Sequence, residues 1–249
     1  MNKQDRIDIF LDTKARATEF KTPPSKKHGA KSIAKKRSRK SGNVIVEGTD
    51  TVTSAVNWSK LGKTCVLNMA SASKPGGGVE KGAQAQEESL FRCSNLHTSI
   101  TKSVYPLNKY EAVYTKGATF FKDFYYETME PVVVDVVTVA AVNLNKDSYY
   151  DEQKQEWVDQ PSRKPLWYSR MTKKKIRLML SLAAQNNVDN LILGAWGCGV
   201  FKNKPEEIAR MFKDVLKEYR GAFENVVFAV INDKNSVANN YEIFKKILG

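Results

Sequence analysis

Residues 64–96 read TCVLNMASASKPGGGVEKGAQAQEESLFRCSNL and contain the three parts of an α/β unit. The run from Thr64 to Met69 is short and apolar, which is typical of a buried strand. A glycine triplet follows at Gly76–Gly78, where a backbone without Cβ atoms can adopt positive φ and approach a ligand closely. From Ala83 to Thr101 the apolar residues recur at helical spacing. The stretch therefore predicts a strand, a glycine-rich loop and a helix.

The same alternation continues on both sides of this stretch. From Val44 onward, short β-branched runs alternate with helical patterns, which indicates a layered α/β domain. Strands are expected at Val44–Val46, Thr64–Met69, Glu111–Thr115, Thr119–Phe121, Val132–Ala141, Asn190–Leu193 and Asn225–Ile231. Helices are expected at Thr51–Leu61, Ala83–Thr101, Ser169–Gln185, Pro205–Tyr219 and Ser236–Ile247. The third of these helices should cover a sheet face with its apolar stripe, leaving Lys173–Lys175 and Arg177 in solvent.

The first 42 residues have a different pattern. Residues Asp5 to Phe20 have apolar side chains at helical spacing and predict a helix packed on the main domain. Pro23 and Pro24 stop this pattern, and Ser25–Gly42 is rich in Lys and Arg without apolar periodicity, which predicts a mobile linker. We therefore divide the chain into an N-terminal helix with its linker, residues 1–42, and one α/β domain, residues 43–249.

The basic core of this linker, Lys35–Lys40, resembles a nuclear-import or nucleic-acid-binding patch. A solvated basic loop without a partner explains the same residues. A second long polar segment, Asn143–Trp167, contains several aromatic residues and is either a lid over a ligand or a loop that its aromatics anchor to the domain.

Two adjacent carboxylates, Glu87 and Glu88, follow the glycine triplet and fall in the first turn of the expected helix. Neighbouring side chains on a helix diverge by roughly 100°, so the two groups can act differently on one ligand. A reading without function is also available, because acidic residues in a first turn stabilise a helix by about 0.3–1 kcal/mol each. A glycine-rich loop directly before the pair favours chemistry.

A second glycine-rich turn follows the expected strand Asn190–Leu193. Gly194, Gly197 and Gly199 stand between that strand and a helix starting near Pro205, an arrangement that presents backbone N–H groups to an anion. Phe201 offers a flat apolar surface for a sugar, and an ordinary core aromatic is the alternative explanation.

Composition limits the kind of chemistry. The 249 residues carry a net charge of +13, which favours a polyanionic partner without separating nucleic acid from other polyanions. With three cysteines and two histidines, a disulfide framework, a zinc site and a histidine-based triad are all unexpected, and carboxylate chemistry remains. Neither a membrane span nor a secretory signal is recognisable, so we expect an intracellular protein, cytoplasmic or nuclear, that acts as a monomer.

Several blocks of the sequence occur in an order that resembles the bacterial-type poly(ADP-ribose) glycohydrolases, a branch of the macrodomain superfamily. The first is the glycine triplet followed by Gln86-Glu87-Glu88. The others are Leu67–Ser71, Arg92–Leu96, Val139–Asn143, Leu193–Phe201 and Val227–Ile231. The resemblance implies a three-layer α/β/α macrodomain with a mixed central sheet and an N-terminal helical extension. It also implies hydrolysis of ribose–ribose O-glycosidic bonds in poly(ADP-ribose), with poly(ADP-ribose) or ADP-ribosylated proteins as partners and without a metal or other cofactor.

The resemblance also assigns roles to residues. Glu88 would be the catalytic acid, and Glu87 would bind the ribose hydroxyls at the scissile bond. The diphosphate would lie on the loop from Gly194 to Phe201, with Phe201 against the terminal ribose. The expected substrate-binding residues are Asn68, Gly76, Gly77, Gly78, Gln86, Gly194, Gly197, Cys198, Gly199, Val200 and Phe201. The adenine is expected near Ile231 and Asn232.

Two other functions remain open at this stage. The same macrodomain can retain ADP-ribose binding without turnover, in which case no ADP-ribose is released from a modified protein. A basic nucleic-acid-binding protein is the third possibility, in which binding depends on Ser25–Gly42 and survives loss of Gly76–Glu88.

Overall fold

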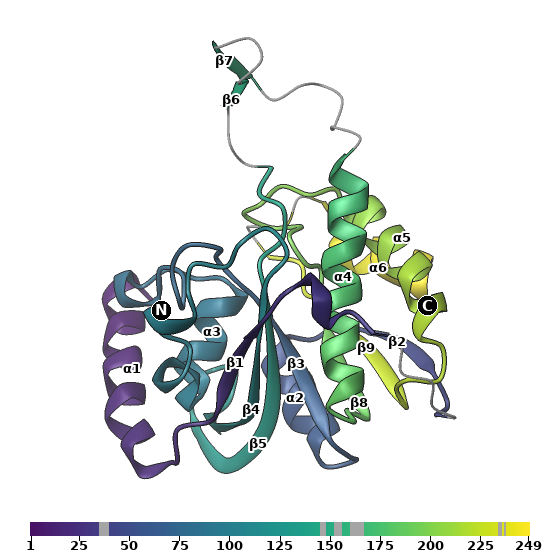
Figure 1. Cartoon of the computed structure of the whole chain (residues 1–249). Coiled ribbons are helices and arrows are strands. Elements are labelled where there is room, and N and C mark those ends of the chain that lie inside the picture. Colours follow the sequence, from purple (N-terminus) through teal and green to yellow (C-terminus); the bar gives the residue numbers. More distant parts are fainter. Residues whose placement is uncertain (35–39, 145–147, 152–155, 160–166, 234–235, 237) are drawn as a thin grey trace.

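The computed structural model describes residues 1–34, 40–144, 148–151, 156–159, 167–233, 236 and 238–249. A seven-stranded sheet in the order β1-β4-β5-β3-β8-β9-β2 forms the centre, with helices on both faces (Figure 1). The strands are β1 Ser25–His28, β2 Asn43–Glu47, β3 Thr64–Met69, β4 Ala112–Lys122, β5 Thr128–Val139, β8 Asn190–Leu193 and β9 Asn225–Ala229. A separate two-stranded sheet pairs β6 Ser148–Asp151 with β7 Glu156–Asp159.

The sheet is mixed. Strands β5, β3, β8, β9 and β2 are parallel to one another, whereas β4 runs antiparallel to both β5 and β1. The carboxyl ends of the parallel strands therefore meet at one edge of the sheet, where open α/β sheets usually bind ligands.

Side chains alternate between the two faces because successive residues of a strand point in opposite directions. In β3, Cys65 and Leu67 belong to one hydrophobic core and Val66 to the other, and all three are fully buried. The first core also contains apolar residues of α4 Trp167–Gln185, α5 Pro205–Leu216 and α6 Asn240–Leu248. The second contains residues of α1 Lys3–Arg16, α2 Thr51–Ser59 and α3 Gln86–Cys93. The predicted α/β/α arrangement with a mixed central sheet is confirmed.

Helix α1 is the predicted N-terminal helix. Asn2 and Asp5 form a capping box at its start, which satisfies two backbone N–H groups. Phe10 is buried in the second core, and the Thr13 hydroxyl donates to the Arg92 carbonyl at 2.6 Å. The helix is therefore packed on the domain as predicted.

The prediction of a linker over Ser25–Gly42 is wrong in its first part. Residues Ser25–His28 form β1, which pairs with β4 at the edge of the sheet. These residues have no apolar alternation, because an edge strand is fixed by backbone hydrogen bonds on one side. The predicted basic patch lies almost wholly outside the described residues, apart from Lys40, which is ion-paired with Asp189. The division of the chain at residue 42 stays a prediction.

Three other elements differ from expectation. The two strands expected between Glu111 and Phe121 are one strand, β4, with register shifts after Thr115 and Phe120. The helix expected over Ala83–Thr101 ends at Cys93 and is followed by a 3-10 turn. Lys175 is 5% exposed and donates to the Ala140 carbonyl at 2.9 Å, so its predicted position in solvent is wrong. The predicted lid, Asn143–Trp167, lies mostly outside the described residues.

Candidate functional site

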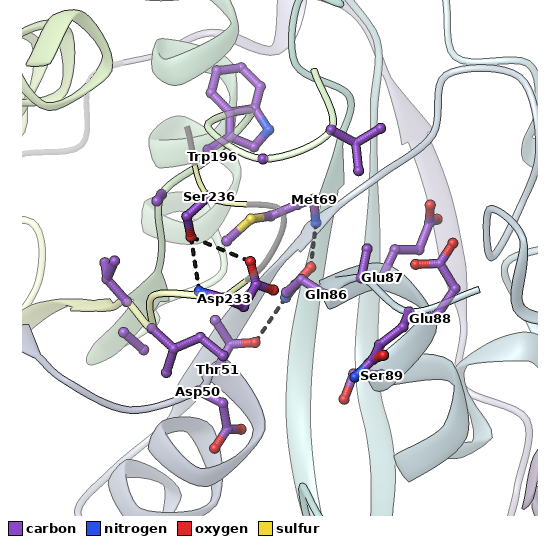
Figure 2. Close-up of a pocket in the computed structure, with 18 of the residues that line it drawn as sticks. Asp50, Thr51, Met69, Gln86, Glu87, Glu88, Ser89, Trp196, Asp233 and Ser236 are labelled. Carbon is purple, nitrogen blue, oxygen red and sulfur yellow. Dashed lines mark hydrogen bonds between the residues drawn. The ribbon is translucent and has the colours of Figure 1, made fainter. Parts of the chain in front are cut away.

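A cavity of about 500 Å³ opens at the carboxyl edge of the parallel strands (Figure 2). That volume lies within the range of about 300–1,000 Å³ that is usual for small-molecule sites. Its walls come from the first turn of α3, the glycine loop before it, the turn between β4 and β5, and the loops after β8 and β9. Both predicted glycine-rich segments therefore face one cavity.

Of the two predicted acids, Glu87 accepts more hydrogen bonds. Its Oε2 accepts from the Ser71 amide at 2.7 Å, and its Oε1 accepts from the Gly76 amide at 3.2 Å. The Asn68 amide and the Tyr105 hydroxyl also donate to Oε1, each at 3.4 Å. The residue is only 3% exposed. The four hydrogen bonds fix its carboxyl at the cavity wall.

Burial raises the pKa of Glu87 from 4.5 to about 8. The hydrogen bond from the Ser71 amide opposes this shift, and the neighbouring charge of Glu88 adds to it. The Glu87 carboxyl can therefore hold a proton near neutral pH.

Glu88 has one satisfied oxygen and one free oxygen. Its Oε1 accepts from the Gly78 amide at 2.8 Å. Its Oε2 is buried and has no hydrogen-bond partner among the described residues, although Glu88 lines the cavity. Leaving a buried polar atom unpaired costs about 1–3 kcal/mol, and such atoms in native structures need an explanation. An oxygen kept free for a ligand in the cavity is one.

The glycine triplet is required by the carboxylates. Gly77 has φ +58°, and a Cβ at this position would lie 2.4 Å from Glu88 Oε1 and 3.1 Å from Glu87 Oε2. The neighbouring Gly76 has φ +70°, and a Cβ there would lie 2.7 Å from the Phe91 ring. Only glycine fits these positions, so the loop closes around the acids and donates its amides to them.

Gln86 joins the start of α3 to two other elements (Figure 2). Its side-chain oxygen accepts from the Met69 amide at 2.8 Å, and its nitrogen donates to the Leu67 carbonyl at 2.7 Å and to the Thr51 hydroxyl at 3.0 Å. Although Gln86 lines the cavity, its amide already has protein partners. It therefore positions the acidic turn against the end of β3.

Asn68 lies behind Glu87 and does not line the cavity. Its side chain is fully buried, and its nitrogen donates to Glu87 and to the Thr138 hydroxyl at 3.3 Å. A ligand in the cavity is therefore shielded from Asn68 by Glu87.

The predicted diphosphate loop divides into residues that line the cavity and residues that support it. Gly197, Gly199, Val200 and Phe201 line it, whereas Gly194 and the buried Cys198 do not. Among the described residues, no hydrogen bond uses the backbone N–H of Gly199, Val200 or Phe201. These three amides are available to an anion.

Asn203 holds this loop from behind. It is fully buried, and its side-chain nitrogen donates to the Val142 carbonyl at 2.8 Å and the Gly197 carbonyl at 3.0 Å. Its side-chain oxygen accepts from the Tyr168 hydroxyl at 2.6 Å. Gly197 has φ +78°, and a Cβ there would lie 2.6 Å from the Asn203 nitrogen, so this bond requires glycine. No sequence pattern singles out Asn203, because its partners are distant in the chain.

Other lining residues were also missed. Phe124, Tyr125 and Tyr126 lie in the turn between β4 and β5, and the Tyr125 side chain is 77% exposed. Three consecutive aromatics at a hairpin turn are unusual enough to have been a signal. Of the two residues expected near an adenine, Ile231 lines the cavity, and Asn232 instead donates to the Asn239 side chain at 2.6 Å.

Within the described part of the chain, no group of three or more His, Cys, Asp or Glu side chains could hold a metal ion. No helix in that same part is both long and apolar enough to cross a membrane.

The chain is similar to known proteins in sequence and in fold. Residues 1–129 match the family described as the microbial-type PARG catalytic domain. No curated protein matches the chain. The structure is similar to poly(ADP-ribose) glycohydrolase (PARG) from Deinococcus radiodurans in complex with ADP-ribose, with 29% identity over 90% of this chain and 94% of that chain and a TM-score of 0.74. It is also similar to poly(ADP-ribose) glycohydrolase from Thermomonospora curvata, with 23% identity over 98% of this chain and 99% of that chain and a TM-score of 0.82. The second likeness concerns the fold alone.

Proposed function

Because the chain belongs to the microbial-type PARG family, we propose that it hydrolyses ribose–ribose O-glycosidic bonds in poly(ADP-ribose) and releases ADP-ribose. The fold is that of the structurally similar glycohydrolases, one of which holds ADP-ribose. The observation that carries the proposal is the pair of buried carboxyls at the cavity wall, one with all its oxygens bound and one with a free oxygen.

In this mechanism Glu88 is the general acid. Glycosidic cleavage requires a proton for the departing ribose oxygen, because without one that ribose has to leave as an alkoxide. A proton carried on Oε2 of Glu88, the oxygen without a protein partner, can be donated to the departing ribose oxygen. The carboxylate that remains then accepts a proton from the attacking water, which restores the acid.

Glu87 orients the reacting ribose. A carboxylate has about four acceptor sites, and Oε2 of Glu87 has one hydrogen bond from the protein, at 2.7 Å from the Ser71 amide. One site on this oxygen is therefore open to a ribose hydroxyl. Fixing the sugar in this way reduces the entropy lost on reaching the transition state.

The rest of the ligand follows the cavity wall. The amides of Gly199, Val200 and Phe201 are positioned to bind the diphosphate, and the Phe201 ring packs against the terminal ribose. The adenine then lies toward Ile231, on the loop after β9. The net charge of +13 increases the local concentration of so anionic a substrate.

The decisive experiment measures ADP-ribose release from a poly(ADP-ribosyl)ated protein by wild type and Glu88→Gln. A general acid contributes about 100- to 10,000-fold to the rate, so the variant should lose turnover by that factor and still bind ADP-ribose. Glu80→Gln, an exposed acid near the same loop, is the control and should keep full activity. Equal release by wild type and Glu88→Gln would exclude this role, and binding of ADP-ribose without release by wild type would identify a binding module.

The wider cellular setting is also part of the proposal. We expect a monomer inside the cell, in cytoplasm or nucleus, with ADP-ribosylated proteins as partners. Nucleic acid is a further possible partner, bound through the basic linker Ser25–Gly42.

A further inference from the structure

Four side chains form a lysine–aromatic patch outside the cavity: Lys109, Tyr110, Trp167 and Lys174. The ammonium group of Lys109 lies 5.6 Å from the centre of the Trp167 ring and 5.9 Å from that of Tyr110. On the other side, the ammonium of Lys174 lies 4.4 Å from the Tyr110 ring. Lysines and aromatic rings therefore alternate, and none of the four lines the cavity.

The patch is accessible and positively charged. Trp167 is 48% exposed, and Lys109 is exposed next to it. Among the described residues, no carboxylate forms an ion pair with Lys109 or Lys174, and the nearby Glu111 is paired with Lys27 at 3.5 Å. Burial, together with the charge of Lys109, lowers the pKa of the underlying Lys175 to about 8. The charges of Lys109 and Lys174 are thus not neutralised by a carboxylate of the described residues.

The patch lies at the same edge of the sheet as the cavity. Helix α4 connects the parallel strands β5 and β8, so it must begin at the carboxyl edge where both strands end (Figure 1). Tyr105, whose hydroxyl donates to Glu87, is five residues before Tyr110. A chain of that length spans at most about 18 Å, so the backbone of Tyr110 lies within that distance of the backbone of Tyr105, the residue that contacts Glu87.

From this juxtaposition we propose that the lysine–aromatic patch binds the part of the poly(ADP-ribose) chain that extends beyond the unit held in the cavity. This inference rests on the proposed function. Each repeat of the polymer contains an adenine and a diphosphate. Aromatic rings stack on bases whatever their identity, and unpaired lysines bind the phosphates through a salt-dependent attraction.

A single-stranded nucleic acid has the same two kinds of group and is the competing occupant. The position of the patch favours the polymer, because a chain that enters the cavity has to leave it next to Glu87. Nucleic acid has no such reason to bind at this edge. The patch would therefore distinguish long chains from short ones and leave the chemical step unchanged.

The experiment compares kcat/KM on a substrate of two ADP-ribose units with kcat/KM on chains of many units. Two variants are used, Trp167→Ala and the double variant Lys109→Gln with Lys174→Gln. The matched control is Lys60→Gln with Lys116→Gln, which removes the same charge from two exposed sites outside the cavity. Thermal unfolding and ADP-ribose affinity establish that each variant is folded with its cavity intact.

Both patch variants should lower kcat/KM on long chains by about tenfold, the loss expected for one stacking or phosphate contact, and leave the two-unit substrate unaffected. The effect of both variants should be confined to KM, and that of the lysine double variant should shrink at high salt. Equal kcat/KM of variants and wild type on long chains would overturn the proposal, as would equal losses on both substrates or on the control. Tighter binding of the patch to single-stranded DNA or RNA than to the polymer would overturn it in favour of nucleic acid.

Failure of the proposed function gives a different result. If wild type releases no ADP-ribose from either substrate, the hydrolase assignment is wrong, and the dissociation constant for long polymer still tests the patch. A dissociation constant about tenfold weaker in the patch variants supports the patch, and an unchanged one overturns it.

Discussion

The backbone of Gly77 lies directly against the carboxylate of Glu88. A Cβ at Gly77 would be 2.4 Å from Glu88 Oε1, which is closer than carbon and oxygen can approach without a bond. The same oxygen accepts the Gly78 amide at 2.8 Å. The positions of the loop and the acid therefore depend on each other, and a methyl group at Gly77 must displace the Glu88 carboxylate.

Gly77→Ala should abolish most activity while leaving the protein folded. If the Glu88 carboxyl moves out of hydrogen-bond distance of the departing oxygen, a contribution of about 100-fold or more to the rate is lost. The measurement is ADP-ribose release together with thermal unfolding.

Gly117→Ala is the matched control for this variant. Gly117 also has positive φ, +70°, but a Cβ there meets the Val133 side chain at an ordinary 3.4 Å. Both variants should lose a similar amount of stability from backbone strain, about 1 kcal/mol, and only Gly77→Ala should lose turnover. Equal activity losses in both would show that strain, and not the position of Glu88, is responsible.

The raised pKa of Glu87 should appear in the pH dependence of stability. Because burial raises this pKa from 4.5 to about 8, the folded protein holds the proton more strongly than the unfolded chain does. The stabilisation is complete below about pH 4.5 and is lost as the pH rises through about 8. Glu87→Gln cannot ionise, so the free energy of unfolding of wild type should fall relative to this variant by up to about 1 kcal/mol per pH unit in that window.

Urea denaturation at several pH values between 4.5 and 8 measures this difference. Glu80→Gln should run parallel to wild type, since Glu80 is exposed. If the free energy of unfolding of Glu87→Gln changes with pH as that of wild type does, the pKa of Glu87 is not raised by folding.

Tyr105→Phe should weaken catalysis without closing the cavity. The substitution removes the hydroxyl that donates to Glu87 at 3.4 Å, a long bond that contributes about 0.5–1.5 kcal/mol. We expect a loss of about two- to tenfold in kcat and a shift in the pH profile of the reaction.

Tyr219→Phe provides the comparison, because the Tyr219 hydroxyl is also buried and donates to the Arg177 carbonyl at 3.0 Å, away from the cavity. It should cost similar stability and leave both kcat and its pH profile unchanged. The role of Tyr105 fails if the two variants behave alike in turnover.

Asn203→Ala should reduce the affinity for ADP-ribose. It removes the donor to the Val142 and Gly197 carbonyls and the oxygen that accepts from the Tyr168 hydroxyl. Unpaired buried groups cost about 1–3 kcal/mol each, so the loop behind the cavity should loosen and stability should fall. Calorimetric titration with ADP-ribose measures the first effect.

Asn190→Ala is the corresponding change in a buried asparagine at the opposite end of β8, where the side chain donates to the Trp58 carbonyl at 3.1 Å. It should destabilise the protein and leave ADP-ribose affinity intact. If both asparagine variants bind ADP-ribose as wild type does, Asn203 has no part in forming the site.

The sequence was informative where a local pattern carries the structure. Strand β3 begins and ends as predicted, because its apolar run is bounded by polar and glycine-containing segments. Strand β1 was missed since its residues are polar and are held by pairing to β4, and pairing at an edge leaves no periodicity. Helix α3 ends early for a tertiary reason: Ser94 forms a bridge to Phe120 of β4 and adopts an extended conformation.

The site shows the same division. The glycine triplet and the acidic pair were recognisable because they are adjacent in sequence. The aromatic turn at Phe124–Tyr126 and the support from Asn203 come from distant segments, and only the fold brings them to the cavity. Asn68 was expected in the site because it stands next to the glycine loop in sequence. Its side chain is instead fully buried behind Glu87, and sequence periodicity does not predict how deeply a side chain is buried.

The anchoring of Glu87 has a practical meaning for inhibitors. Donors from β3, from the turn after it, from the glycine loop and from Tyr105 all converge on one carboxyl. A compound that reaches this wall meets a Glu87 Oε1 that already accepts hydrogen bonds from Asn68, Gly76 and Tyr105, so a donor aimed at that oxygen gains little. Selective affinity has to be sought at the unpaired Oε2 of Glu88 and along the open amides of Gly199–Phe201.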